Sequence, residues 1–254
     1  MTAPPPASPP SAFDLTGAAS LWMVLQWVDV ETAAALLPPE LTLMPVAGAQ
    51  GGQHPLLYSL GRQQNVKLAF APFGGWNYDE TLFGVCSVAV RSPAGPVGPF
   101  SYMTQLRLNS LVAMLIGRAL GYPKDLSRIA TSDTSYRIGT AFSNTTLLDA
   151  HCEAQGPAFD GTLGGFQMMG RFLADPVISR AITGSLLVSR FEIDPAGHVM
   201  RPAGVTISVP TTKIHGLAPG QYHWPPITAA TPGGVQSTHQ WRLARPRRFA
   251  GTTS

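Results

Sequence analysis

The chain has 254 residues, of which 44% are hydrophobic and 12% are charged, and its formal net charge is +3. Its 26 glycines and 24 prolines favour many short strands joined by turns around a large core. No nucleic-acid motif occurs and basic and aromatic residues do not interleave, so we expect no nucleic-acid partner. Cys86 and Cys152 lie far apart without metal-site or redox spacing, and both are expected to be free thiols.

The absence of a long polar linker and of an internal repeat predicts a single domain over residues 13–245. Residues 1–12 are expected to be a disordered proline-rich leader, and residues 246–254 a solvated basic tail. The N-terminus has no basic n-region, and the apolar run from Ala18 to Val28 is too short to span a bilayer. These features indicate a cytoplasmic protein without a membrane partner.

Apolar, aromatic and β-branched runs predict strands along most of the chain. In chain order they cover residues 21–28, 56–60, 66–71, 82–90, 100–108, 136–144, 145–153, 163–172, 185–193 and 204–210. The Gly74-Gly75 pair indicates a turn, and the glycines within 161–170 indicate a bend. Short helices are expected at 30–37, capped by Asp29, and after Asp175-Pro176, while loops are expected beyond residue 210.

Residues 111–120, LVAMLIGRAL, give the clearest helix signal. Asn109 or Ser110 can cap the helix at its start, and Gly121 suits a left-handed end. The helix is apolar nearly all round, so we expect it inside the protein. Its C-terminal end should therefore deliver Tyr122-Pro123-Lys124 to a buried or half-buried place.

Lys124 is one of only three lysines in the chain, and it follows a proline. Pro123 fixes its own φ and biases Tyr122 to extended geometry, so the amine should point in a defined direction. Amine catalysis needs the free base, whereas an unperturbed lysine has a pKa of about 10.4. Lowering that pKa to about 7 takes an environment worth roughly 4 to 5 kcal/mol, which an apolar pocket or a neighbouring cation can supply.

Four segments occur in an order that resembles the acetoacetate decarboxylase superfamily over about residues 18–135. They are LLPPEL at 36–41, YDE at 78–80, GPFSYM at 98–103 and GRALGYPKDL at 117–126. The resemblance implies an α+β fold that is predominantly antiparallel β, with a barrel or cone-shaped double sheet and a buried helix. It also implies that no metal or organic cofactor is needed, and that the protein is a homo-oligomer.

The resemblance implies a catalytic role for Lys124, which matches the lysine with which the family's active members form a Schiff base. Glu80, the glutamate of Tyr-x-Glu, is implied to lie near the amine and to transfer protons. An iminium is an electron sink that eases carbanion formation, and a nearby carboxylate can carry the proton.

Four further side chains are candidates for the substrate pocket. Trp76, Tyr102 and Tyr122 can line an apolar pocket, although aromatic residues in a β protein are equally often plain core. Arg118, from the Gly-Arg pair, can contact substrate, but we favour a structural ion pair for it. The histidines His215, His223 and His239 are too irregularly spaced for a metal site, so we expect none.

Several positions depart from the family pattern. Asp125 replaces the second lysine of true decarboxylases; if close and ionised it would favour the ammonium form of Lys124, but it can instead face an arginine or a helix N-terminus. Ala19 stands where the decarboxylases carry an arginine, and Ala69 aligns less securely with a glutamate. Ala119 replaces the glutamate of Gly-Arg-Glu. The nucleophile is therefore kept while its usual helpers are missing.

We therefore expect a lysine-dependent lyase that acts through a Schiff base on a small keto acid or activated ketone. Aldol chemistry with dehydration, or condensation or cyclisation in secondary metabolism, is preferred. One alternative is a decarboxylase of β-keto acids such as acetoacetate. The other is a non-covalent cyclase or small-molecule binder that uses the same pocket.

Overall fold

A computed structural model describes residues 11–249, except residues 50, 72–74, 160–162 and 182. The described residues are predominantly antiparallel β, as predicted. The elements in chain order are β1 (Leu15–Asp29), α1 (Val30–Ala35), β2 (Leu41–Leu43), β3 (Gln53–Leu68), β4 (Trp76–Val90), β5 (Val97–Leu108), α2 (Leu111–Ala119), β6 (Lys124–Thr131), β7 (Ser135–Thr140), β8 (Thr146–Ala154), α3 (Gly164–Ala174), β9 (Val177–Arg180), β10 (Leu186–Ser189), β11 (Phe191–Ile193), β12 (Val199–Val209), β13 (Gly220–Trp224), β14 (Gly234–Leu243) and β15 (Arg247–Arg248).

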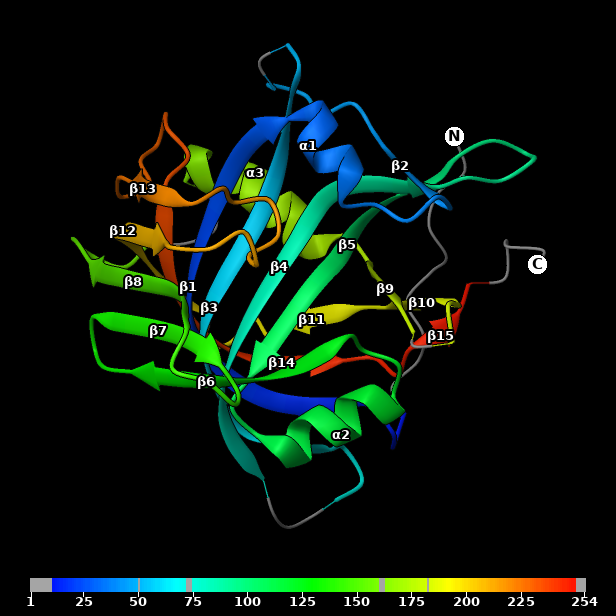
Figure 1. The fold of residues 1–254 in the computed structure, drawn as a ribbon, viewed down its shortest axis with the longest axis horizontal. Coiled ribbons are helices and arrows are strands. Elements are labelled where there is room, and N and C mark those ends of the chain that lie inside the picture. Colours follow the sequence, from blue (N-terminus) through cyan, green and yellow to red (C-terminus); the bar gives the residue numbers. More distant parts are fainter. Residues whose placement is uncertain (1–10, 50, 72–74, 160–162, 182, 250–254) are drawn as a thin grey trace.

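The strands close into a ring (Figure 1). Hydrogen-bonded neighbours run β5-β6-β7-β8-β12-β14-β1-β3-β4, and β4 pairs back to β5. The series β9-β10-β15 continues from β5, while β2, β11 and β13 attach to β4, β14 and β12. The β5–β6 and β5–β9 pairs are parallel, and the other described strand pairs are antiparallel. The predicted closure of the sheet is thereby confirmed.

Two apolar clusters share the strands β1, β3 and β4, which explains their almost unbroken hydrophobic runs. Successive residues of a strand face opposite sides. Val24 accordingly belongs to a cluster shared with β7, β8 and β12, whereas Met23 and Leu25 belong to a second cluster. That second cluster includes residues of α2 and α3 and surrounds the cavity described below.

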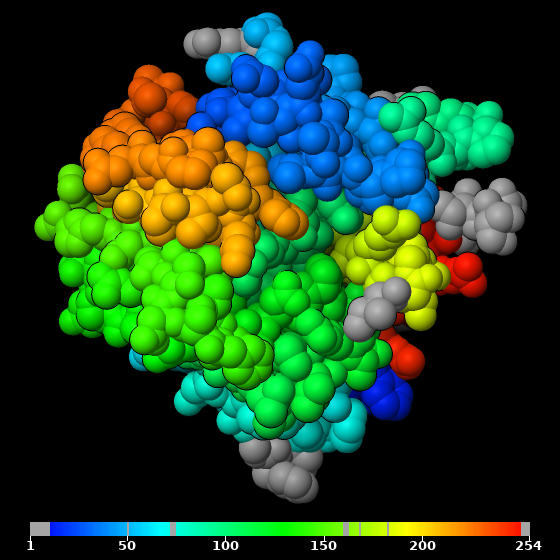
Figure 2. All heavy atoms as spheres, in the orientation of Figure 1, coloured from blue at the N-terminus to red at the C-terminus, as the bar shows by residue number. Residues whose placement is uncertain are grey.

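The helix α2 follows the prediction at both ends. The Ser110 hydroxyl accepts a hydrogen bond from the amide of Ala113, and Gly121 has a φ of +93°. Its predicted burial on all sides is wrong, because Leu111, Val112 and Leu115 are each about half exposed. In Figure 2, drawn in the orientation of Figure 1, α2 lies on the lower surface. One face, which includes Met114 and Gly117, packs on the sheet.

Other local predictions need correction. The two strands predicted at 56–60 and 66–71 are one strand, β3, with an irregularity between Gln63 and Val66. Asp29 precedes α1 as expected but makes no side-chain capping bond. Residues 163–172, predicted as a strand, form most of helix α3, and no helix follows Asp175-Pro176. Gly164 and Gly165 start α3 where its backbone closely approaches the carbonyls of Ala229 and Thr228, so the glycines serve packing rather than a bend.

Parts of the predicted leader, turn and tail, namely residues 1–10, 74 and 250–254, lie outside the described residues. Within the tail, Arg247 and Arg248 form β15, pair with β10 and remain exposed. Cys86 and Cys152 are buried free thiols, as predicted. Among the described residues no helix has the length and apolar character needed to cross a membrane.

Candidate active site

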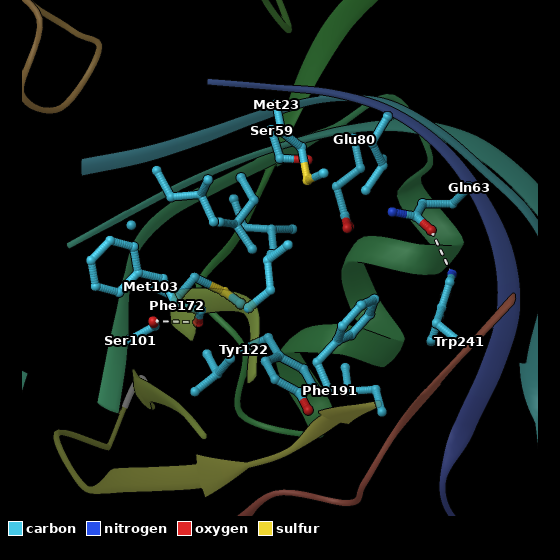
Figure 3. A pocket seen from close by; sticks show the side chains of 18 of the residues that line it. Met23, Ser59, Gln63, Glu80, Ser101, Met103, Tyr122, Phe172, Phe191 and Trp241 are labelled. Carbon is cyan, nitrogen blue, oxygen red and sulfur yellow. Dashed lines mark hydrogen bonds between the residues drawn. The ribbon is translucent and has the colours of Figure 1, made fainter. Parts of the chain in front are cut away.

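A mainly apolar cavity of about 140 Å³ lies in the second cluster (Figure 3). Its walls come from β1, β3, β4, β5 and β14, and it is completed by α3, β9, β11 and the start of β6. A dry cavity of about 150 Å³ is large enough to bind benzene, so this one suits a small organic molecule. The polar side chains that line it are those of Ser59, Gln63, Tyr78, Glu80, Ser101, Tyr102, Tyr122, Lys124 and His239.

Lys124 and Glu80 meet in this cavity as a buried ion pair. The Lys124 Nζ lies 2.8 Å from the Glu80 Oε2, and their side chains are 8% and 12% exposed. Lys124 is the first residue of β6 and Glu80 lies in β4, so the pair joins strands on both sides of β5. The amine therefore has a proton acceptor within hydrogen-bond distance.

Tyr78 forms a second contact to the amine. Its hydroxyl lies 3.4 Å from the Lys124 Nζ, and its ring centroid lies 5.2 Å from the same atom. Burial raises the pKa of Tyr78 well above its ordinary value, and the charge of Glu80 acts in the same direction. Tyr78 is therefore a neutral phenol at neutral pH, which can stabilise a cation through its ring face and can donate a hydrogen bond.

The stem of Lys124 is held by the end of α2. A Cβ placed on Gly117 would overlap the Lys124 Cδ and lie 2.6 Å from its Cε. The chain then turns through Gly121, and the Lys124 amide bonds to the Tyr122 carbonyl at 2.8 Å. The predicted delivery of the lysine to a buried place is confirmed, and it depends on glycine at position 117.

Asp125 does not enter the cavity. Its carboxylate lies 2.8 Å from an Arg118 Nη2, and the two side chains are 50% and 40% exposed. The Arg118 Nε also donates to the Lys124 carbonyl at 2.6 Å. Arg118 is thus in the structural ion pair we favoured, outside the cavity lining, and it braces the turn that carries the amine.

The predicted pocket aromatics divide into two groups. Tyr102 and Tyr122 line the cavity, and both are buried. Trp76 is 37% exposed at the start of β4 and does not line it. Burial raises the pKa of Tyr122, so its phenol is neutral at neutral pH.

Among the described residues, no cluster of three or more histidine, cysteine or carboxylate side chains is placed to hold a metal ion. His215, His223 and His239 lie apart, on a loop, on β13 and on β14. His239 nevertheless lines the cavity.

In sequence, no family model and no curated protein matches the chain. Solved structures do match it over nearly its full length. The enduracididine biosynthesis enzyme MppR, complexed with the condensation product of pyruvate and imidazole 4-carboxaldehyde, is 13% identical with a TM-score of 0.59, over 97% of this chain and 92% of its own. An acetoacetate decarboxylase-like enzyme from Sphingomonas wittichii RW1 is 13% identical with a TM-score of 0.61, over 95% of both chains.

Acetoacetate decarboxylase from Legionella pneumophila is 14% identical with a TM-score of 0.59, over 96% of this chain and 88% of its own. The chain has the acetoacetate decarboxylase-like fold. The resemblance inferred from the four motifs is therefore confirmed at the level of the fold. The shared fold also covers the C-terminal half, in which sequence analysis found only a generic β-rich segment.

Within the acetoacetate decarboxylase-like fold, sequence reasoning missed a group of cavity residues far from the motifs. The Trp241 indole donates to the Gln63 Oε1 at 3.0 Å, and both side chains are buried. Figure 3 shows the Gln63 amide nitrogen directed toward Glu80. Ala69, aligned with the family glutamate, lies beyond the end of β3, whereas Gln63 lies in β3 and reaches the cavity. No sequence signal marks Trp241, because Ser237 and His239, the nearest preceding buried residues on the same face of β14, are polar.

Proposed function

We propose that this protein is an enzyme that forms a Schiff base between Lys124 and a small keto acid or activated ketone. The observation that carries the proposal is the Lys124 amine 2.8 Å from the Glu80 carboxylate inside an apolar cavity. A carboxylate at that distance can accept the proton of the ammonium. Proton transfer from Lys124 to Glu80 then yields a free amine and a carboxylic acid.

The free amine can attack a carbonyl carbon to give a carbinolamine. Glu80 returns its proton to the carbinolamine oxygen, which leaves as water, and an iminium cation remains on Lys124. Tyr78 lies with its ring face toward that nitrogen and stabilises the cation. Loss of an α-proton from the iminium moves an electron pair to nitrogen and gives an enamine, which adds to an aldehyde and so regenerates the iminium. Loss of water from that adduct, followed by hydrolysis of the iminium, releases the condensation product and the free Lys124 amine.

One finding favours condensation over decarboxylation of a β-keto acid. MppR, which shares the fold, was complexed with the condensation product of pyruvate and imidazole 4-carboxaldehyde. Lys124 is the only lysine or arginine among the residues that line the described cavity, so either reaction of a keto acid would leave its carboxylate without a second cation. Decarboxylation is the alternative, because acetoacetate decarboxylase has the same fold.

Borohydride reduction tests the proposal directly. Incubation with pyruvate, acetoacetate or acetone followed by borohydride should add the reduced substrate mass to the peptide that contains Lys124. Peptide mapping by mass spectrometry locates the adduct. No adduct with any of these ketones or with a wider panel of keto compounds would overturn the Schiff-base mechanism and favour the non-covalent alternative.

Gly117→Ala should slow adduct formation about 10- to 100-fold, because its Cβ would displace the Lys124 stem and misplacement of a reacting group by ~1 Å can cost that much. Alanine stabilises a helix interior by about 1 kcal/mol relative to glycine, so a lowered rate would not reflect a weakened helix. Gly51→Ala, at a position with nothing within 4 Å, is the matched control. Equal rates of borohydride-trapped adduct in the two variants would contradict the prediction.

A further inference from the structure

His239 lines the cavity and has one ring nitrogen without a hydrogen-bond partner among the described residues. The residue is 2% exposed and lines the cavity from β14. Its Nδ1 lies 2.9 Å from the Ser237 Oγ, while its Nε2 is buried with no hydrogen-bond partner among the described residues. Leaving a buried nitrogen unpaired costs about 1–3 kcal/mol unless a ligand pairs with it. A bound molecule that reached this nitrogen would satisfy it.

Ser237 connects His239 to the edge of the molecule. The Ser237 Oγ also lies 3.0 Å from the Nε2 of His198. Ser237 is fully buried, whereas His198 is half-buried. The result is a continuous hydrogen-bonded chain from the cavity through one hydroxyl to an imidazole near solvent.

The sheet brings His239 to the same face as the other polar residues of the cavity. Ala19 is paired in register with His239 on one side and with Gln63 on the other, and Gln63 is paired with Tyr78. Directly opposite residues on neighbouring strands share a face. Because Ala19 has only a methyl group, no large side chain of β1 stands between His239 and Gln63 at this level.

We propose that His239 is a second acid–base group of the cavity and that Ser237 and His198 carry its proton to and from solvent. This inference rests on the Schiff-base function proposed above. His239 would take the α-proton of the iminium, whereas Glu80 serves the carbonyl oxygen and the amine. Ser237 and His198 act through His239 and are positioning residues.

The protons balance along this chain. In one arrangement the His239 Nδ1–H donates to Ser237, Ser237 donates to the His198 Nε2, and the His239 Nε2 is free to accept. When the substrate C–H proton passes to that Nε2, the Nδ1 proton moves to the Ser237 oxygen. The Ser237 proton then moves to the His198 Nε2, and His198 releases its Nδ1 proton to water. Both imidazoles end neutral, and the reverse transfer returns a proton to the substrate carbon.

Burial supports this use of a neutral imidazole. Desolvation, reinforced by the neighbouring His198, lowers the pKa of His239 to about 4, and desolvation also lowers the pKa of His198. His239 is therefore uncharged at neutral pH, and it can accept a proton only if it passes another one on. The hydrogen-bonded chain through Ser237 and His198 provides the path for that second proton.

The test separates proton transfer from Schiff-base formation. Deuterium exchange into the methyl groups of acetone and of pyruvate is followed by NMR in D₂O, and the borohydride-trapped adduct is measured in parallel. His239→Gln should form the adduct within about twofold of the unchanged protein and lose exchange by about 100-fold. His223→Gln, which replaces an exposed histidine outside the cavity, is the matched control.

Unchanged exchange in His239→Gln overturns the proposal, as does a wild-type adduct without any exchange. If His239→Gln loses both adduct and exchange, His198→Ala becomes the deciding variant, because residue 198 is near the surface and its substitution is less disruptive to the cavity. In His198→Ala the deuterium exchange should fall about tenfold and be restored by added imidazole. Unchanged exchange in His198→Ala overturns proton transfer through Ser237 and His198. Absence of any adduct in the wild-type protein instead identifies failure of the Schiff-base function itself.

Discussion

Lys124→Arg is expected to abolish the borohydride-trapped adduct and to reduce turnover by about 10³-fold or more, which corresponds to ~4 kcal/mol of transition-state stabilisation. Arginine keeps the positive charge and can still pair with Glu80. It cannot be deprotonated in a protein, so it offers no nucleophilic amine. Condensation of pyruvate with imidazole 4-carboxaldehyde, the pair named for MppR, is a suitable assay alongside acetoacetate decarboxylation.

This substitution separates covalent from non-covalent catalysis. If Lys124 acts only as a cation, Lys124→Arg should keep substantial activity and the adduct should be absent from the unchanged protein as well. Lys213→Arg is the control, because Lys213 is an exposed lysine outside the cavity. Thermal unfolding of both variants checks that a lost adduct does not reflect a lost fold.

The position of Lys124 could be predicted because its determinants are local. Ser110 starts α2, Gly121 ends it in left-handed geometry, and Pro123 directs the chain into β6. The start and end of α2 and the entry into β6 are thus determined by residues close in sequence to the lysine. The partner Glu80 came only from the family motif, since 44 residues separate it from Lys124 and no local pattern joins them.

The rest of the cavity could not be predicted, because its residues are far apart in sequence and no local pattern joins them. Trp241 and Gln63 are 178 residues apart, and they meet only because β1 pairs with both β3 and β14. In β14 the buried positions Ser237 and His239 are polar, so the strand does not alternate in hydrophobicity although it alternates in burial. When the side chains of a strand that face a cavity are polar, the strand lacks the alternation of apolar and polar residues by which sequence analysis recognises it.

The direction of the Asp125 side chain could not be predicted from the sequence either. Its identity alone left two outcomes open, a charge in the pocket or an outward ion pair. In the structure the Asp125 carboxylate pairs with Arg118 at the surface, so its negative charge does not lie beside the Lys124 amine. Adjacent residues of a strand face opposite sides, which explains why Lys124 enters the cavity and Asp125 leaves it.

Glu80→Gln is expected to lower turnover by about 10²- to 10⁴-fold, the range for removal of a positioned acid–base group. Glutamine has nearly the same shape and can still accept a hydrogen bond from Lys124, but it cannot take the proton of the ammonium or return one to the carbinolamine oxygen. Because both of these proton transfers precede the iminium, the borohydride-trapped adduct should form more slowly by a similar factor.

Asp125→Asn is the matched control for this change, because it removes a carboxylate next in sequence to Lys124 but outside the cavity. It should leave turnover within about twofold, since an exposed ion pair is worth only about 0–1 kcal/mol. A Glu80→Gln variant as active as Asp125→Asn would contradict proton transfer by Glu80 and favour a binding role for the pocket. An adduct that forms at the rate of the unchanged protein while turnover falls would instead place Glu80 after iminium formation.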